Sequence, residues 1–424
     1  MAVRPDEWAH TESTSRFAAQ RRGLTERPQW WCKFFHVSNE VQWPSGRRSR
    51  HGRLLALLRD EGASTRIELA RRMSSSPTTV SRIVAQLIDG GFVAEGARVT
   101  RAGVGRRGTE VDIAVDSHWV VGVQIGVGRV RVGVANLVGR CLALSGFSFD
   151  PGARATDVVA RAARTLLALI VGARVRRDRV VAVGVAVPGP VDDARRRLLM
   201  QINLAWEDVA VADVLERLVG LPVVVEHNVR SMALAEAVFG AARGVGSVGF
   251  IHLRTGIGAG LVVAGRGFLG GVHGAIELGH IRVTEGGRRC SCGAVGCLET
   301  ELSDRGLRRS LRQVGARCDG REPLAALLRA ARADRGAAIV LDTLIGKLAA
   351  ALSMVVNLLT PEIILLGGSL ELLPDGLIDR LSRNTREGVF PVIRPSVRLQ
   401  RSSLGPDAGV KGAATAALDR FVYA

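Results

Sequence analysis

The sequence predicts an α/β protein that carries a small helical head on its N-terminal side. Two observations lead to this prediction. From Val120 to the C-terminus, β-branched runs alternate with runs of helical periodicity, which is typical of sheets covered by helices. From Arg47 to Ile113, three helical runs precede short strands around a tip rich in glycine and arginine. A length of 424 residues accommodates two or three domains.

The elements of the head have recognisable boundaries. A first helix presents an apolar face over Leu54–Leu58, and a second short helix covers Ile67–Met73. Ser76 is a suitable N-cap and Pro77 a suitable first residue for a third helix. Three helices followed by a two-stranded tip form the winged helix-turn-helix layout, which we assign to residues 47–113.

The third helix is the expected DNA reader, because the second helix of a helix-turn-helix unit places exposed side chains on base edges. Its outward positions carry short hydrogen-bonding groups and one arginine: Thr78, Thr79, Ser81, Arg82 and Gln86. At the tip, Arg106 and Arg107 suit the minor groove, whose negative potential attracts arginine. Residues 46–109 hold thirteen arginines against five acidic residues, a net charge of +8, which favours a polyanionic partner. The alternative is a protein-interaction module with a solvated basic face.

The charge of the whole chain is a weaker argument for a nucleic-acid partner. The net charge is +18, but it is almost entirely arginine and is spread over the whole sequence. Residues 1–46 show no sustained periodicity, and we expect a poorly ordered extension there. No apolar signal segment and no run of eighteen uncharged apolar residues occurs. We therefore expect a cytoplasmic protein without a membrane span.

The body alternates strands and helices. The predicted strands are Val120–Ile125, Val130–Leu137, Val180–Val187, Val223–Glu226, Val248–Leu253 and Ile363–Leu366. The predicted helices are Asp157–Val171, Val209–Leu218, Val229–Phe239, Ala337–Leu359 and Gly376–Arg386.

One histidine and three cysteines have the spacing of a metal site. His280 is followed by Cys290, Cys292 and Cys297 within a glycine-rich loop. One imidazole and three thiolates suit tetrahedral Zn²⁺ and leave no open position, so a structural zinc is expected. Reduced cysteines without a metal are the alternative.

The body contains several short motifs of recognisable kind: Gly274–His280, Cys290–Glu299, Gly184–Asp192, Asn203–Trp206, Thr255–Gly260, Leu366–Leu370 and Asp407–Val410. Together these motifs resemble those of the ROK family of repressors, open reading frames and kinases. The resemblance implies an actin-like (RNase H-like) two-lobed sugar-kinase fold over residues 118–424, with a sugar cleft between the lobes. The first lobe would cover about 118–240 plus the C-terminal helix, and the second about 241–404 with the zinc knuckle 280–297. It also implies cytoplasmic homodimers or homotetramers.

The motifs that resemble those of the kinases lack two catalytic side chains. In the family's kinases the base for the sugar hydroxyl is an Asp that directly follows an Asn. Here His227 and Asn228 stand at these positions, and an amide cannot take a proton at neutral pH. The first phosphate loop carries Gln124 where the kinases have an Asp, and an amide is a poor replacement near Mg²⁺. The second loop, Thr255–Gly260, keeps its glycines, either as an inherited tight turn or for ATP.

The sugar-binding positions are kept. By resemblance, Glu277, His280 and Glu299 match residues that hold sugar hydroxyls, and Asn228 and His227 complete the ring. His280 would use one ring nitrogen for zinc and the other for the sugar. Capping or structural hydrogen bonding is the alternative role of Glu277 and Glu299.

These features predict a non-enzymatic transcription regulator. Its head would bind operator DNA, and a sugar or sugar phosphate would change the spacing of paired heads. Two alternatives stay open at this point: an ATP-dependent, glucokinase-like sugar kinase with an appended DNA-binding head, and a ligand-independent DNA-binding protein whose body only oligomerises.

Overall fold

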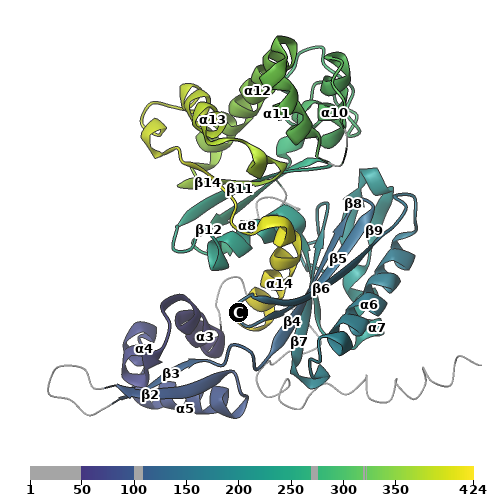
Figure 1. Cartoon of the computed structure of the whole chain (residues 1–424). Helices are drawn as coiled ribbons and strands as arrows, with labels where there is room; N and C mark the ends of the chain where they lie inside the picture. The colour runs from purple at the N-terminus through teal and green to yellow at the C-terminus, as the bar shows by residue number, and fades with distance from the viewer. Residues whose placement is uncertain (1–48, 100–107, 269–275, 319, 321) are drawn as a thin grey trace, which may run out of the picture.

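A computed structural model describes residues 49–99, 108–268, 276–318, 320 and 322–424. The head lies at one end of an elongated molecule, and the two lobes of the body follow it (Figure 1). The predicted extension, residues 1–46, and the predicted wing tip with Arg106 and Arg107 lie outside the described residues.

The head contains the three predicted helices and a small sheet. The helices are α3 (Arg50–Glu61), α4 (Arg66–Met73) and α5 (Pro77–Asp89). Thr65 and Glu68 form a capping box at the start of α4, and the Ser76 side chain accepts the Thr79 N–H at the start of α5. The sheet has the order β1 (Ser64–Thr65), β3 (Gly108–Ile113), β2 (Val93–Val99). Strands β2 and β3 pair with each other and form the two arms of the wing.

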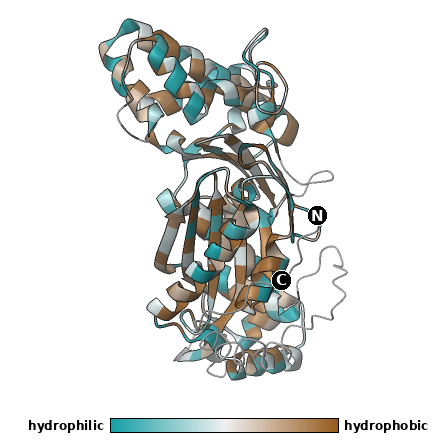
Figure 2. Cartoon of the chain, turned by 90° about the vertical axis from the view of Figure 1, so that its right-hand side faces the viewer, coloured by the Kyte–Doolittle hydropathy of each residue, from teal (hydrophilic) through white to brown (hydrophobic). Residues whose placement is uncertain are grey.

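The first lobe is a five-stranded sheet covered on both faces. Its order is β10 (Val223–His227), β7 (Val180–Val187), β4 (Trp119–Gly126), β5 (Arg129–Asn136), β6 (Cys141–Ser148). Helices α6 (Ala155–Gly172) and α7 (Val211–Val219) pack on one face, and α14 (Ala408–Phe421) packs on the other. The hairpin of β8 (Leu198–Gln201) and β9 (Trp206–Val209) adjoins it. Hydrophobic residues follow the strands of this lobe, and hydrophilic residues mark the outer helix faces (Figure 2).

The second lobe is also built on a five-stranded sheet. Its order is β13 (Arg266–Gly267), β12 (Ile257–Val263), β11 (Ser247–Leu253), β14 (Ile363–Gly368), β15 (Leu399–Arg401). Its helices are α9 (Leu298–Leu302), α10 (Asp304–Gln313), α11 (Pro323–Ala333), α12 (Arg335–Leu359) and α13 (Asp375–Glu387). By length and composition α12 could cross a membrane, but more than half of its most apolar stretch is buried within the lobe. We therefore assign it to the core.

Helix α8 (Asn228–Phe239) lies between the two sheets. Its apolar residues share a core cluster with β11, β12 and β14 of the second lobe, although the sequence analysis placed it with the first lobe. On its other side it crosses α14 so closely that a side-chain carbon at Gly412 would lie 2.6 Å from the Ser231 hydroxyl. The helix that begins at Asn228 therefore contacts both lobes.

The head is joined to the body through a shared core. The apolar residues of α3, α4 and α5 belong to one cluster with the end of α14 and the chain terminus, including Leu418, Val422 and Tyr423. The Ser49 hydroxyl donates to the Ala424 main-chain oxygen at 2.7 Å. No local pattern in the sequence predicts this contact.

Candidate functional site

The outward face of α5 is formed largely as the sequence predicts. Thr78, Ser81, Arg82 and Gln86 are exposed. The Thr79 hydroxyl hydrogen-bonds the Ser76 hydroxyl at 2.9 Å and so contributes to the helix cap. At the other end of the face, Gln86 Oε1 lies 2.9 Å from His51 Nε2 of α3. On this outward face, the exposed side chains of Thr78, Ser81 and Arg82 form no hydrogen bond with another described residue, so the groups available for DNA lie near the start of the helix.

His280 and the three cysteines form one cluster. Their ligand atoms all lie within 4.8 Å of one another. Cys290 Sγ is 3.6 Å from His280 Nδ1, and Cys292 Sγ is 3.8 Å from Cys297 Sγ. Tetrahedral ligands about 2.3 Å from a zinc ion lie about 3.8 Å apart, so the separations fit a metal ion. Burial and the neighbouring thiols raise the pKa of the Cys297 thiol to about 12, which means that a metal must displace its proton.

The cluster is continuous with the predicted sugar site. While His280 Nδ1 faces the thiols, its Nε2 lies 4.0 Å from Glu277 Oε2. Glu299 Oε2 accepts the Ile257 N–H at 3.1 Å, and a side-chain carbon at Gly256 would lie 2.5 Å from the same oxygen. Burial, opposed by His280 and reinforced by Glu299, raises the pKa of Glu277. The carboxylate of Glu277, at the start of the short 3-10 helix Leu278–His280, therefore lies near that of Glu299, on α9.

The end of β10 and the start of α8 bring His227 and Asn228 to the same region. The next residue, Val229, packs against Gly258. Gly258 directly follows Ile257, whose main-chain N–H donates to the Glu299 carboxylate. His227 is buried, and its Nδ1 has no hydrogen-bond partner among the described residues. Burial first, and then the charge of Arg230, lowers the pKa of His227 to about 3. The imidazole is therefore neutral at physiological pH and can exchange hydrogen bonds with a hydroxyl.

A buried ion-pair group holds this segment. Glu226 is buried, accepts the His227 N–H at 2.8 Å, and forms ion pairs with Arg195 and Arg230. A carboxylate buried with two guanidinium groups is strongly held, because removing either partner leaves a buried charge. Sequence reasoning missed Arg195 because its partner is distant in the chain and no motif marks it.

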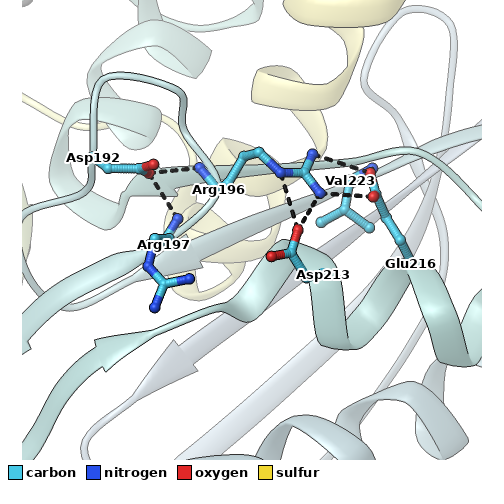
Figure 3. Close-up of polar contacts among 6 residues, drawn as sticks. All are labelled: Asp192, Arg196, Arg197, Asp213, Glu216 and Val223. Atoms are coloured by element: carbon cyan, nitrogen blue, oxygen red, sulfur yellow. Dashed lines mark hydrogen bonds and ion pairs between the residues drawn. The ribbon is translucent and has the colours of Figure 1, made fainter. Parts of the chain in front are cut away.

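A second polar network joins the loop after β7, helix α7 and the first residue of β10 (Figure 3). Asp192 Oδ1 accepts the main-chain N–H groups of Arg196 and Arg197, each at 2.7 Å. The Arg196 guanidinium pairs with Asp213 and Glu216 of α7. Glu216 also accepts the Val223 N–H at 3.0 Å. The loop after β7, helix α7 and strand β10 are thereby tied together.

The segment that resembles the first phosphate loop of the kinases packs at Gln124 against the start of α14. The Gln124 side chain lies directly against Gly409 at the start of α14. Nearby, the Arg131 guanidinium forms an ion pair with Asp407 and donates to the Pro406 carbonyl oxygen. An amide and a charge-neutralised carboxylate replace the free acidic group that Mg²⁺ would need here.

Comparison with known proteins identifies the body. A family model described as ROK family matches residues 120–420. The chain belongs to the ROK family. A family model described as MarR family matches residues 49–95, which agrees with the helix-turn-helix geometry of the head.

Relatives of this ROK-family chain include both regulators and kinases. The N-acetylglucosamine repressor of Escherichia coli O157:H7 is 27% identical over 372 residues, 84% of this chain and 91% of the repressor. The crystal structure of a ROK family transcriptional regulator, a homologue of the E. coli MLC protein, is 28% identical with a TM-score of 0.76 and covers 88% of this chain and 96% of its own. A ROK family glucokinase from Streptomyces griseus, solved with glucose and AMPPNP, is 30% identical with a TM-score of 0.61 and covers 70% of this chain and 98% of its own. The regulators match more of the chain than the glucokinase, which favours a transcription regulator over a sugar kinase.

Proposed function

We propose that this ROK-family chain is a sequence-specific DNA-binding regulator, most simply a repressor of genes for sugar uptake or catabolism. The segment 47–113 binds operator DNA and the body 118–424 binds the effector. One observation carries the proposal: Asn228 stands where the kinases that the chain resembles have their catalytic base, while Glu277, His280 and Glu299 stay grouped with one another. A site that binds without reacting is what a sensor requires.

The effector is a sugar or a sugar phosphate held by His227, Asn228, Glu277, His280 and Glu299. The carboxylates accept pairs of hydroxyl hydrogens, and the Asn228 amide donates and accepts. His227 supplies a neutral imidazole whose buried Nδ1 has no partner among the described residues, so a hydroxyl of the effector would satisfy it.

A structural zinc ion held by His280, Cys290, Cys292 and Cys297 would set the orientation of the His280 ring. The separations of the four ligand atoms support this assignment. With Nδ1 on the metal, Nε2 is fixed toward Glu277 and the effector.

On DNA, α5 places Thr78, Thr79, Ser81 and Arg82 at base edges and phosphates, with Gln86 at the end of the face. Arg106 and Arg107 of the wing tip are proposed minor-groove contacts. A cytoplasmic homodimer or homotetramer would present two heads to two half-sites about one helical turn, or a multiple of it, apart. Effector binding shifts operator affinity because it favours one lobe arrangement.

The primary test uses Arg82→Ala and, as a matched control, Arg164→Ala on the exposed face of α6. Operator affinity is measured by anisotropy on the DNA upstream of the gene, and effector affinity by calorimetry. Arg82→Ala should weaken operator binding about fivefold to a hundredfold, the loss typical of one arginine contact in a groove, and leave effector affinity unchanged. Equal operator affinity in the two variants would rule against α5 as the reader.

The alternative, a sugar kinase with a DNA-binding head, is tested separately by ADP release over a sugar panel. The proposal expects no turnover, because Asn228 cannot accept the hydroxyl proton. Turnover that Asn228→Ala abolishes would establish the kinase instead. Operator binding with no calorimetric signal from any sugar, on zinc-loaded protein, would point to a ligand-independent regulator.

A further inference from the structure

An arginine-rich surface lies beside the metal cluster, on the lobe remote from the head. We call it the arginine face and define it as Arg288, Arg289, Arg305, Arg309 and Arg312. Arg288 and Arg289 belong to the loop that carries the cysteines, and the other three belong to α10. Four of the five are exposed, and Arg309 is half-buried.

Both segments are tied to α9 (Leu298–Leu302). The Thr300 hydroxyl donates to the Cys297 carbonyl at 2.7 Å, and Arg309 Nη1 donates to the Thr300 carbonyl at 3.2 Å. The guanidinium groups repel one another. The pKa of Arg309 is lowered, first by burial and then by the charges of Arg288, Arg305 and Arg312, and the charge of Glu301 opposes this shift only in part. The fold thus concentrates like charges on one side of α10.

The arginine face lacks internal neutralisation. None of its five guanidinium groups forms an ion pair within the part of the chain that the structure describes. Elsewhere in the described residues exposed arginines form ion pairs, as Arg176 does with Asp178. The nearby Glu301 is already paired with Lys347. A zinc ion with three thiolates carries one net negative charge, which is too little to offset five arginines.

We propose that the arginine face binds a carboxylate-rich segment of another protein. Guanidinium groups suit carboxylates because they donate two parallel hydrogen bonds, and arginine is enriched at protein interfaces where lysine is depleted. Helix α10 has ten residues and is therefore about 15 Å long, enough for a short acidic helix or strand. The exposed Val295 in the same loop adds apolar contact.

Two observations favour a protein over a nucleic acid. The head, to which operator DNA is proposed to bind, lies at the opposite end of the molecule from α10 (Figure 1). Residues 276–318 contain no Phe, Tyr or Trp, so the surface has no platform on which single-stranded bases could stack.

The experiment compares two double variants of the full, zinc-loaded chain. Arg305→Gln with Arg312→Gln removes two charges from the arginine face. Arg164→Gln with Arg217→Gln removes two exposed charges from α6 and α7 of the other lobe. The probes are a fluorescein-labelled oligoglutamate peptide and a labelled duplex of random sequence, titrated by anisotropy at physiological salt.

The first double variant should bind the peptide about fivefold to thirtyfold more weakly, as expected for two lost surface ion pairs, and the second should stay within about twofold of the wild type. Charge reversal by Arg305→Glu should weaken peptide binding further. Equal peptide affinity in the two double variants would overturn the proposal. So would a loss confined to the duplex, which would make the face a nucleic-acid surface. Circular dichroism and zinc content check that each variant is folded.

Discussion

The guanidinium of Arg59 lies over the aromatic ring of Tyr423, 4.5 Å from its centroid. Arg59 belongs to α3 of the head, and Tyr423 follows α14 of the body. The Tyr423 hydroxyl donates to the Leu137 carbonyl at 2.5 Å. The Tyr423 side chain, just after α14, therefore contacts both the head, at Arg59, and the segment that follows β5 in the first lobe, at Leu137.

This contact gives a physical route between the two proposed sites. Helix α14 crosses α8, whose first residue is Asn228 in the proposed effector site. At its other end α14 leads into Tyr423 and Ala424, which lie against α3. A shift of α8 on effector binding would be transmitted along α14 to the head, provided that the helix moves as a rigid element.

Replacing Tyr423 by Phe tests the hydroxyl alone. The ring stays packed, but the buried Leu137 carbonyl loses its donor. We expect the free energy of unfolding to fall by about 1–3 kcal/mol, the usual penalty for an unsatisfied buried acceptor. Urea unfolding followed by circular dichroism measures it, and an unchanged midpoint and slope would show that this hydrogen bond contributes nothing.

Replacing Arg59 by Ala tests the coupling between head and body. The ratio of operator affinities without and with effector should move toward one, while the effector affinity of the DNA-free protein stays unchanged. Arg161→Ala is the matched control, because Arg161 lies 4.1 Å over the Phe147 ring in the first lobe, away from the head. If the two variants keep the same ratio as the wild type, the signal does not pass through Arg59.

Removal of zinc should affect both stability and effector binding. Cys292→Ser takes away a proposed ligand, so the bound zinc should fall below one ion per chain and the melting temperature should drop. Effector affinity should fall with it, since the His280 ring loses its fixed orientation. Cys318→Ser, at a half-exposed cysteine outside the cluster, should change none of these. Metal content by mass spectrometry and differential scanning fluorimetry give the readouts. Full zinc content in Cys292→Ser would contradict the four-ligand assignment.

Local patterns predicted most of the elements, because caps and periodicity are local properties. Ser76 and Pro77 set the start of α5 as expected. Boundaries were less certain where propensity and pairing compete: Val209 was expected in a helix, but it pairs with Leu198 in a hairpin and α7 begins at Val211.

The residues of the candidate site were predictable from the sequence, but the distant contacts that hold them in place were not. The spacing of His280 and the cysteines predicted a cluster that the structure brings together. By contrast, Arg195, Arg59 and Tyr423 act through partners far away in the chain. Arg195 reaches Glu226 because the loop that follows β7 is hydrogen-bonded to β10. Sequence periodicity carries no information on such contacts.

The buried histidines make the protein sensitive to acid, and His227 contributes to this sensitivity. Its pKa is lowered to about 3, whereas an unfolded chain has an ordinary histidine pKa near 6.5. Above about pH 6.5 the imidazole is neutral in both states and has no effect. Below it the unfolded state takes up the proton first, so stability falls progressively until the pH reaches the folded pKa.

His227→Gln should therefore reduce the dependence of the unfolding free energy on pH by about 1.4 kcal/mol per pH unit between about pH 6 and pH 4. A residual slope should remain, because burial also lowers the pKa values of His118 and His252 to about 4. Urea unfolding at several pH values provides the measurement. The same slope in wild type and variant would mean that His227 is protonated in the folded protein. A charged imidazole can only donate to a sugar hydroxyl, so the proposed neutral state of His227 in the effector site would not hold in that pH range.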